Sequence, residues 1–274
     1  MSAQLEHLNL LRQETEERRK HRRRLVRILR AEGFQNVDAS TGSLLSALGR
    51  AGVFRLGGTV VGTHAFRLYE GTLGVRYRFD DMAQTGDIDI ASFERLSLAL
   101  DDIANPPLPG VLEGLSFAPG PSLDGNKVWR WRQTRNDLMV EFLTPSFQEE
   151  EGIRSLAALG VDAQSLHHLN YLIAEPVTAV VTYRSGVLVQ IPRPERFAIH
   201  KLIVADRPRK STDSLKSEKD RLQATFLIAI LAEDRPDELR EAYIDARNAG
   251  QQWGTRLDAS LKRLPSVKAI LDSL

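Results

Sequence analysis

Two aspartates in the segment Thr85-Gly86-Asp87-Ile88-Asp89-Ile90-Ala91 are the side chains of this 274-residue sequence best suited to chemistry. Residues two apart in a β-strand point to the same face, so Asp87 and Asp89 share one face and the isoleucines take the other. The acidic face then presents two hard oxygen ligands about 7 Å apart along the strand. Such a pair suits Mg²⁺ that arrives with a nucleoside triphosphate. The alternation therefore predicts a strand with a metal-binding pair.

A glycine pair, Gly57-Gly58, precedes the aspartates in the chain. Residues 53–56 read as a strand that runs into the pair, and residues 59–73 read as the helix that it opens. Glycine lets a backbone approach a phosphate closely, and a helix N-terminus offers unpaired N–H groups. Thr59 and Thr63 add hydroxyl donors. The pattern predicts a phosphate cradle upstream of the two carboxylates.

A third carboxylate, Glu141, lies within an otherwise apolar run. Residues 127–132 and 138–143 alternate as the two strands of a hairpin, with a polar turn at residues 133–136. A carboxylate buried there without a partner costs several kcal/mol, so it needs a metal, an arginine or solvent. Two interpretations stay open: Glu141 is a metal ligand beside the aspartates, or it pairs with Arg130 or Arg132 across the hairpin.

The first 33 residues read as a helix that ends at Gly33 and carries a basic run from Arg18 to Arg24. One interpretation is a solvated helix face whose charge is balanced by the glutamates that precede it. The other is a surface for RNA or another phosphate-rich partner.

The remaining elements follow from periodicity and turn residues. We expect a short helix at 43–48, a strand at 87–93, a helix at 93–103, a connector at 105–121, a hairpin at 178–191 turning at Ser185-Gly186, and helices at 196–205, 215–233, 236–249 and 256–274. Strands thus occupy the middle of the chain and helices its end. The expected fold is α+β, with a small mixed β-sheet, an N-terminal helix and a C-terminal helical region. We divide it into an N-terminal helix (1–35), a catalytic domain (36–193) and a C-terminal helical region (194–274).

The composition of the chain excludes several classes of protein and of binding site. The formal net charge is only +1, so affinity for nucleic acid would need local patches. The sequence has no cysteine, which excludes disulfides and thiolate metal sites. It shows neither an 18-residue apolar run nor a signal-peptide pattern, so no membrane association is predicted and a cytoplasmic location is expected.

Three features together resemble the signature of the nucleotidyltransferase superfamily related to DNA polymerase β. They are the glycine pair, the Asp-x-Asp motif of Asp87 and Asp89, and the later acid Glu141. The run from Gly57 to Phe66, with Leu73-Gly74-Val75-Arg76 and Thr85 to Ile90, is similar to an uncharacterised bacterial family with this fold. One departure is the 28 residues between Gly58 and Asp87, where the superfamily usually has roughly a dozen. The extra residues, 69–85, suggest a loop at the mouth of the active site.

The C-terminal part is similar to the helical motif of abortive-infection-type toxin nucleotidyltransferases. The similarity lies in Pro194 to Leu202, then Arg207, Arg209 and Lys210, then Lys216-Ser217-Glu218-Lys219-Asp220, and the whole resemblance covers about residues 40–235. It implies that Asp87, Asp89 and Glu141 bind metal and serve as the catalytic residues. It also implies nucleotide-binding roles for Gly57, Gly58, Thr59, Thr63, Lys201, Arg209, Lys219 and Asp220. Asp220 has an equal alternative, which is to hold Lys201 or Arg209 in place.

The activity that this resemblance implies is transfer of a nucleoside monophosphate from an NTP, such as ATP, to an acceptor hydroxyl. Pyrophosphate is released, and Mg²⁺ or Mn²⁺ is the cofactor. The acceptor is an RNA end, a protein or a small molecule. Two alternatives are a non-catalytic nucleotide-binding protein on the same fold and an RNA-binding module built around Arg18 to Arg24.

Overall fold

The computed structural model describes residues 2–34, 36–76, 86–94, 102–121, 127–148, 150–206 and 214–274. Its centre is a mixed sheet in which strands run in the order β1-β2-β5-β4-β3, with β7 paired to β5 and β6 to β7. The strands are β1 (Thr59–Val61), β2 (Asp87–Ala91), β3 (Phe117–Pro119), β4 (Arg130–Gln133), β5 (Met139–Pro145), β6 (Ile153–Leu156) and β7 (Val161–Leu166). A separate hairpin joins β8 (Val177–Val181) and β9 (Val187–Ile191).

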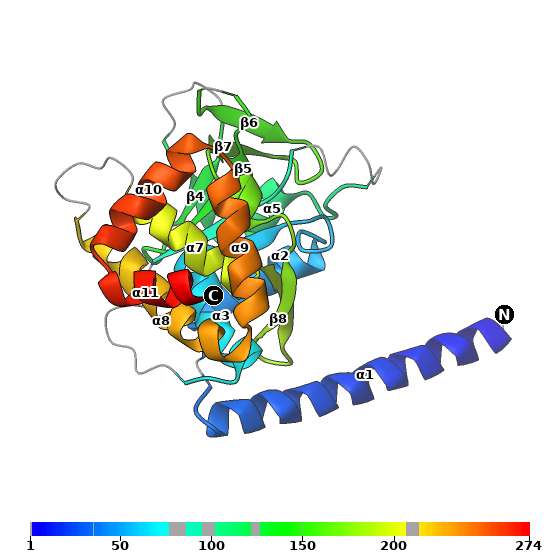
Figure 1. Ribbon diagram of the computed structural model, residues 1–274. Helices are drawn as coiled ribbons and strands as arrows, with labels where there is room; N and C mark the ends of the chain where they lie inside the picture. The colour runs from blue at the N-terminus through cyan, green and yellow to red at the C-terminus, as the bar shows by residue number, and fades with distance from the viewer. Residues whose placement is uncertain are drawn as a thin grey trace.

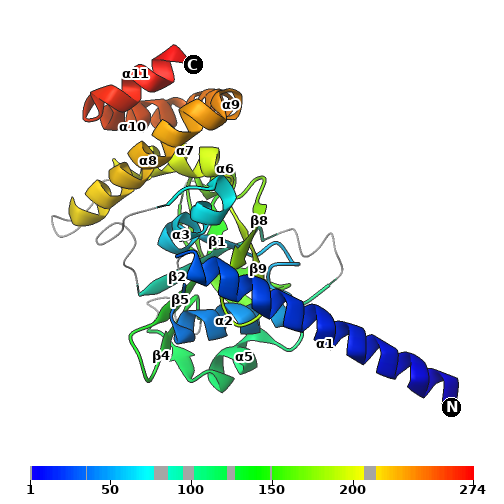
Figure 2. The ribbon, with the colours of Figure 1, turned by 90° about the horizontal axis from the view of Figure 1, so that it is seen from below.

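Helices surround the sheet unevenly. They are α1 (Ser2–Ala31), α2 (Ala39–Arg50), α3 (Gly62–Leu73), α5 (Leu108–Gly114), α6 (Leu169–Leu172), α7 (Pro194–Ala205), α8 (Ser214–Asp234), α9 (Pro236–Asn248), α10 (Gln251–Lys262) and α11 (Pro265–Ser273). Helices α8 to α11 gather at one end of the molecule, and α1 projects from the body (Figures 1 and 2). The predicted α+β fold, with its N-terminal helix, mixed sheet and C-terminal helices, is confirmed.

The parallel pair β2 and β5 forms the middle of the sheet, and it is flanked by antiparallel β1 and β4. The apolar residues that alternate along the pair are fully buried, among them Ile88, Ile90, Val140 and Phe142. Burying this face fixes the register, because a slip of one residue would turn every apolar side chain outward. The polar side chains of both strands are therefore held on the opposite face.

Helix α3 connects the sheet to the C-terminal helices. Its Phe66 stacks on Phe197 of α7, with ring centroids 6.1 Å apart, and Tyr69 meets the same ring edge-on at 5.2 Å. The Tyr69 hydroxyl donates a hydrogen bond of 2.9 Å to the carbonyl of Pro192, just before α7. These contacts hold α7 at a fixed position over the sheet.

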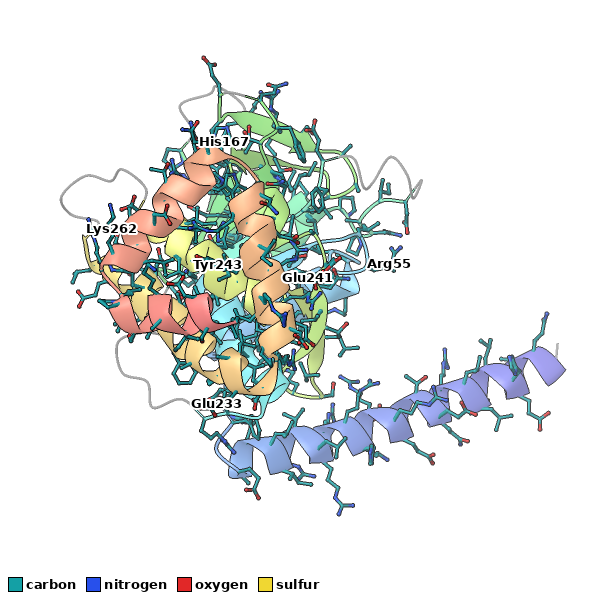
Figure 3. All side chains as sticks on the ribbon, viewed as in Figure 1. Arg55, His167, Glu233, Glu241, Tyr243 and Lys262 are labelled. Carbon is teal, nitrogen blue, oxygen red and sulfur yellow. The ribbon has the colours of Figure 1, made fainter. Side chains whose placement is uncertain are left out.

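Helix α1 is the predicted N-terminal helix, and it contributes little to the core. Val26 is its buried side chain, whereas Leu5, Leu8, Leu25 and Ile28 are all exposed. Side chains along the N-terminal half of α1 project into open space (Figure 3). The helix is thus held to the body at its C-terminal end.

The structure corrects the prediction around the glycine pair. Residues 53–56 form turns rather than a strand, and the N–H of Gly58 donates to the carbonyl of Val53 at 2.9 Å. Residues 59–61 form β1, so the helix begins at Gly62 rather than at Thr59. Val53 and Leu56 are buried because these turns pack into the core, and an apolar run of this length does not distinguish a strand from packed turns.

The structure also differs from the predicted secondary structure in four other places. The predicted connector at 105–121 contains α5 and β3, and the helix predicted at 256–274 divides into α10 and α11 before Pro265. The helix predicted at 43–48 is part of the longer α2, and β6 and β7 were not predicted. The helix predicted at 93–103 lies largely outside the described residues. Among the described helices, none combines the length and apolarity needed to cross a membrane.

Candidate active site

A row of paired residues crosses the sheet at its acidic face. Asp89 of β2 is in register with Glu141 of β5 on one side and with Val61 of β1 on the other, and Glu141 is in register with Arg130 of β4. Side chains of directly paired residues project from the same face. Asp87 shares this face, two residues earlier along β2. The structure therefore brings the three predicted carboxylates, Asp87, Asp89 and Glu141, to one face of neighbouring strands.

The three carboxylates disfavour each other's charged form. Burial raises the pKa of Asp89 to about 7, together with the charges of Glu141 and Asp87, while Lys216 and Lys201 act in the opposite direction. Burial and Asp87 likewise raise the pKa of Glu141, against Arg130 and Lys216. A cation placed among these side chains would relieve the repulsion.

Glu141 is not in a hairpin ion pair within the described ranges. The Arg130 guanidinium instead donates to the carbonyl of Pro121, at 3.1 and 2.7 Å, and Arg132 pairs with Asp137 at 2.6 Å. Arg130 influences Glu141 only through its charge. The contacts thus leave Glu141 available to a ligand at the acidic face.

The start of α3 lies directly against Asp89. Gly62 has a φ of +65°, and a Cβ built on it would lie 2.4 Å from Oδ2 of Asp89. Only glycine meets both demands, because a left-handed backbone is unfavourable for other residues and the carboxylate occupies the space of a side chain. Thr63 follows as the second residue of α3. The sequence therefore places a helix N-terminus, with its partial positive charge, at the acidic face.

The glycine pair predicted to perform this role lies elsewhere. Thr59 is in register with Ala91, so Gly57-Gly58 lies beyond the opposite end of β2 from Asp87. A Cβ on Gly58 would lie 2.4 Å from Cγ1 of Val53, and the buried Thr59 hydroxyl donates to the carbonyl of Gly57 at 3.3 Å. The interpretation of this pair as the opening of a helix is wrong, because it forms a tightly packed turn before β1.

Basic side chains of the C-terminal helices lie within electrostatic range of Asp89. Lys201 of α7 and Asp220 of α8 form a buried ion pair with Nζ 2.6 Å from Oδ1, and Lys201 Nζ lies 5.2 Å from the centre of the Phe197 ring. Burial lowers the pKa of Lys219, as do the charges of Lys201 and Lys216. The structure thus gathers cations on α7 and α8 next to the acidic face.

Lys216 was not among the site residues predicted from the sequence. Lys216 influences both Asp89 and Glu141, and its spacing of four residues from Asp220 would have placed the two on one face of a helix. His64, the third residue of α3, lines a separate small cavity with Val60, Arg67 and Val181. It is buried, and its Nε2 has no hydrogen-bond partner within the described residues. Burial and the charge of Arg67 lower its pKa to about 4. A lone histidine carries no sequence signal of such a position. The predicted Arg209 lies outside the described residues, as do residues 77–85 of the predicted loop.

The oxygen atoms at the acidic face are of the chemical type that binds a divalent cation. Carboxylate oxygens are the ligands that Mg²⁺ and Mn²⁺ prefer, and Asp87, Asp89 and Glu141 supply three carboxylates on adjoining strands. Within the described ranges, no three acidic, histidine or cysteine side chains converge on one point closely enough to enclose an ion in their present rotamers.

Comparison with known protein families gives a match over most of the chain. Residues 39–248 match the model of a family described as Nucleotidyltransferase. A crystal structure of an antigenic nucleotidyltransferase-like protein from Paracoccidioides brasiliensis aligns with a TM-score of 0.46 and 14% identity, over 87% of this chain and 95% of that chain. No curated protein matches the sequence.

Proposed function

The chain belongs to the Nucleotidyltransferase family, and we propose that it transfers a nucleoside monophosphate from an NTP to an acceptor hydroxyl, with release of pyrophosphate. The observation that carries this proposal is the pairing of Asp89 with Glu141 in register across the central parallel strands. Lys201 and Lys216 lie within electrostatic range of that pair. The site thus combines carboxylates for a metal with cations for a polyphosphate.

Asp87, Asp89 and Glu141 would hold Mg²⁺ or Mn²⁺ at the acidic face. A bound divalent cation supplies charge neutralisation for the triphosphate and lowers the pKa of a nearby hydroxyl. Gly62 contributes by leaving room for the Asp89 carboxylate against the start of α3. The N–H groups at Gly62 and Thr63 would then face the phosphates. In this proposal they take the phosphate-binding role that the sequence analysis gave to Gly57, Gly58 and Thr59.

The cations of α7 and α8 would bind the β- and γ-phosphates. Lys201 is held by Asp220, so its ammonium is oriented before nucleotide binds. Lys216 and Lys219 extend the positive surface along α8, and Arg209 would add a further cation. Pyrophosphate carries away most of the negative charge of the triphosphate, so these residues stabilise the leaving group as its bond to the α-phosphorus breaks.

The acceptor oxygen would attack the α-phosphorus in line with the departing pyrophosphate. Its proton needs a base, and Glu141, whose pKa is raised by burial and by Asp87, is suited to accept it. RNA 3′ ends, protein side chains and small molecules all offer such a hydroxyl, and the fold is compatible with each of them.

The proposal is tested by incubating the purified protein with each α-labelled NTP, Mg²⁺ or Mn²⁺ and a cell lysate. Label should enter RNA, protein or a small molecule with one or more NTPs, and pyrophosphate should appear in equal amount. EDTA and the Asp89→Asn variant should both abolish the transfer. Absence of labelled product from the wild-type protein with all four NTPs and both metals would contradict the proposal.

A further inference from the structure

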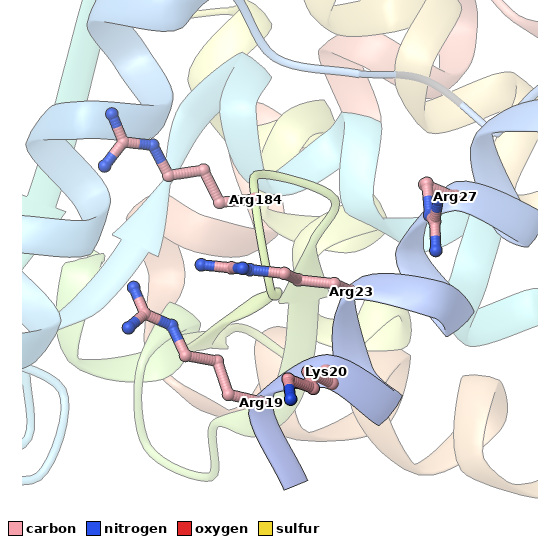
Figure 4. A pocket seen from close by; sticks show the side chains of 5 residues that line it. All are labelled: Arg19, Lys20, Arg23, Arg27 and Arg184. Atoms are coloured by element: carbon pink, nitrogen blue, oxygen red, sulfur yellow. The ribbon is translucent and has the colours of Figure 1, made fainter. Parts of the chain in front are cut away.

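A strongly basic cavity lies away from the acidic face, between α1 and the turn that joins β8 to β9. It has a volume of about 640 Å³ and is lined by Arg19, Lys20, Arg23, Arg27 and Arg184 (Figure 4). Four of these residues come from α1, and Arg184 comes from the turn. Every lining side chain is a cation, which is unusual for a protein of almost neutral net charge. We call this cavity the α1 groove.

Packing fixes the two walls of the α1 groove relative to each other. Val26, between Arg23 and Arg27 on α1, is only 4% exposed. A Cβ built on Gly186 in the turn would lie 3.6 Å from Cγ2 of Val26, which is ordinary van der Waals contact. Beyond the end of α1, the guanidinium of Arg76 lies 4.0 Å from the centre of the Phe34 ring. The groove is thus a defined feature of the fold.

Charge in the groove is largely uncompensated. Arg19 lies 3.9 Å from Glu16, a long and exposed contact. Among the described residues, Lys20, Arg23, Arg27 and Arg184 have no carboxylate within 4 Å, and Arg184 instead lies 5.2 Å from the centre of the Tyr183 ring. Gathering like charges without counter-charges is unfavourable by itself, so the arrangement favours a polyanionic ligand.

We propose that the α1 groove binds the phosphodiester backbone of single-stranded RNA. Arg19, Arg23 and Arg27 recur every four residues, so their Cα atoms are about 6 Å apart along the helix. This spacing is comparable to that of successive phosphates along an extended strand. A lipid surface is a poorer fit, because all five side chains that line the groove are cations and none is an apolar side chain that could insert between headgroups. The choice of RNA over DNA rests on the proposed function, in which an RNA end is one of the acceptors of the transferred nucleotide.

Binding can be tested without catalysis, by fluorescence anisotropy of a labelled single-stranded RNA with the full chain in EDTA and without NTP. The test variant is Arg23→Ala/Arg27→Ala, and the matched control is Arg18→Ala/Arg22→Ala, which removes the same charge from the same helix outside the groove. A third variant, Arg184→Ala, tests the opposite wall. Circular dichroism checks that α1 stays helical in each.

The logarithm of the wild-type binding constant should fall linearly with the logarithm of the salt concentration. The groove variant should bind about tenfold more weakly, with a slope reduced in magnitude by about 1.4. Arg184→Ala should weaken binding in the same direction, and the control should change it less than about twofold. Equal losses in groove and control variants would show non-specific attraction and overturn the proposal. Tighter binding of single-stranded DNA of the same sequence, or stronger binding to phosphatidylserine vesicles that competes with RNA, would also overturn it. Because no metal or NTP is present, failure of this test is distinct from failure of the transferase assay.

Discussion

Lys201 and Asp220 form a buried ion pair, with Nζ 2.6 Å from Oδ1, that joins α7 to α8 beside the acidic face. The two side chains are only 11% and 4% exposed, so neither charge is well solvated. A pair of this kind gives little net stability, but removal of one partner leaves an uncompensated buried charge. We therefore propose that Asp220 acts on a bound nucleotide through Lys201, as a positioning residue.

Substitution within this pair should affect both nucleotide binding and the stability of the fold, and the two effects are measured separately. Lys201→Ala should weaken NTP binding more than NMP binding, because its ammonium would meet phosphates that a monophosphate lacks. Asp220→Asn should give a milder form of the same defect, and both should lower the free energy of unfolding by about 3–5 kcal/mol. Calorimetry with NTP and NMP measures the first effect and denaturant melts the second. Lys268→Ala, in an exposed pair on α11, is the control and should change stability by about 0.5 kcal/mol or less. Equal losses for NTP and NMP would remove Lys201 from the site.

The aspartate pair should be essential for activity and not for folding. Asp87→Asn and Asp89→Asn should each reduce nucleotidyl transfer by more than about 10²-fold, as expected for loss of one major electrostatic stabiliser. Far-UV circular dichroism should remain that of the wild type. Asp258→Asn, an exposed aspartate on α10, serves as control. Wild-type turnover in both site variants would exclude the assignment.

Removal of the Glu141 charge should stabilise the protein when metal is absent. Burial and Asp87 both raise the pKa of Glu141, so ionised Glu141 is disfavoured in the folded state. Glu141→Gln should therefore melt at the same or a higher temperature than wild type in EDTA, and should respond more weakly to Mg²⁺. A lower melting temperature in EDTA would instead indicate an ion pair with Arg130.

Stability without metal should depend on pH through Asp89. Its pKa is about 7 in the folded protein against 3.8 for the ordinary group, so the folded state binds the extra proton between these values. The stabilisation from Asp89 is thus complete below about pH 4 and is lost as pH rises to about 7. The melting temperature of Asp89→Asn minus that of wild type, measured in EDTA, should grow from pH 5 to pH 8.

The test uses the difference in melting temperature between Asp89→Asn and wild type, because titration of His64 changes stability with pH in the opposite direction. Its pKa is lowered to about 4 from 6.5, so its contribution to stability is lost as pH falls through this range. Subtraction of the two melting curves cancels this effect. A difference that does not change with pH would show that Asp89 titrates normally.

Gly62 and Gly71 offer a matched pair of substitutions in one helix. Gly62→Ala forces a left-handed residue to carry a Cβ 2.4 Å from the Asp89 carboxylate, so it should displace that carboxylate and reduce activity strongly. Gly71→Ala meets no atom within 4 Å and should stabilise α3 by about 0.5–1 kcal/mol. Transfer assays and melting curves on both variants check this. Activity of Gly62→Ala close to that of Gly71→Ala would show that the close contact is not required.

Features with a strong local signal could be predicted from the sequence. The strand at Asp87, both hairpins and α1 follow from alternation, turn residues and a long polar helical pattern, and the structure confirms them. The sharing of one face by Asp87 and Asp89 followed from strand geometry alone. Their approach to Glu141 was expected from a family resemblance, because register between strands that are distant in sequence has no local signal.

Other features depended on tertiary packing. The turns at residues 53–56 are as apolar as a strand, because Val53, Phe54 and Leu56 are buried in the core. The prolines and glycines of 105–121 indicated a connector, whereas Pro109 lies in the first turn of α5 and Gly114 ends it. In β7 the buried positions include Ala163, which is small, and Ser165, which is polar. The alternation of buried and exposed residues along this strand is therefore not visible as an alternation of large apolar and polar side chains.

The central parallel pair has a consequence for the order in which the molecule assembles. Asp89 and Glu141 are adjacent in space but 52 residues apart in the chain, so a long loop must close before they meet. Local elements such as the β8–β9 hairpin and the C-terminal helices can form earlier, because their contacts span short stretches of chain. During refolding, helical circular dichroism should accordingly recover before nucleotide-binding capacity does. In a refolding chain the acidic site would therefore form only at a late stage, after much of the helical structure is already in place.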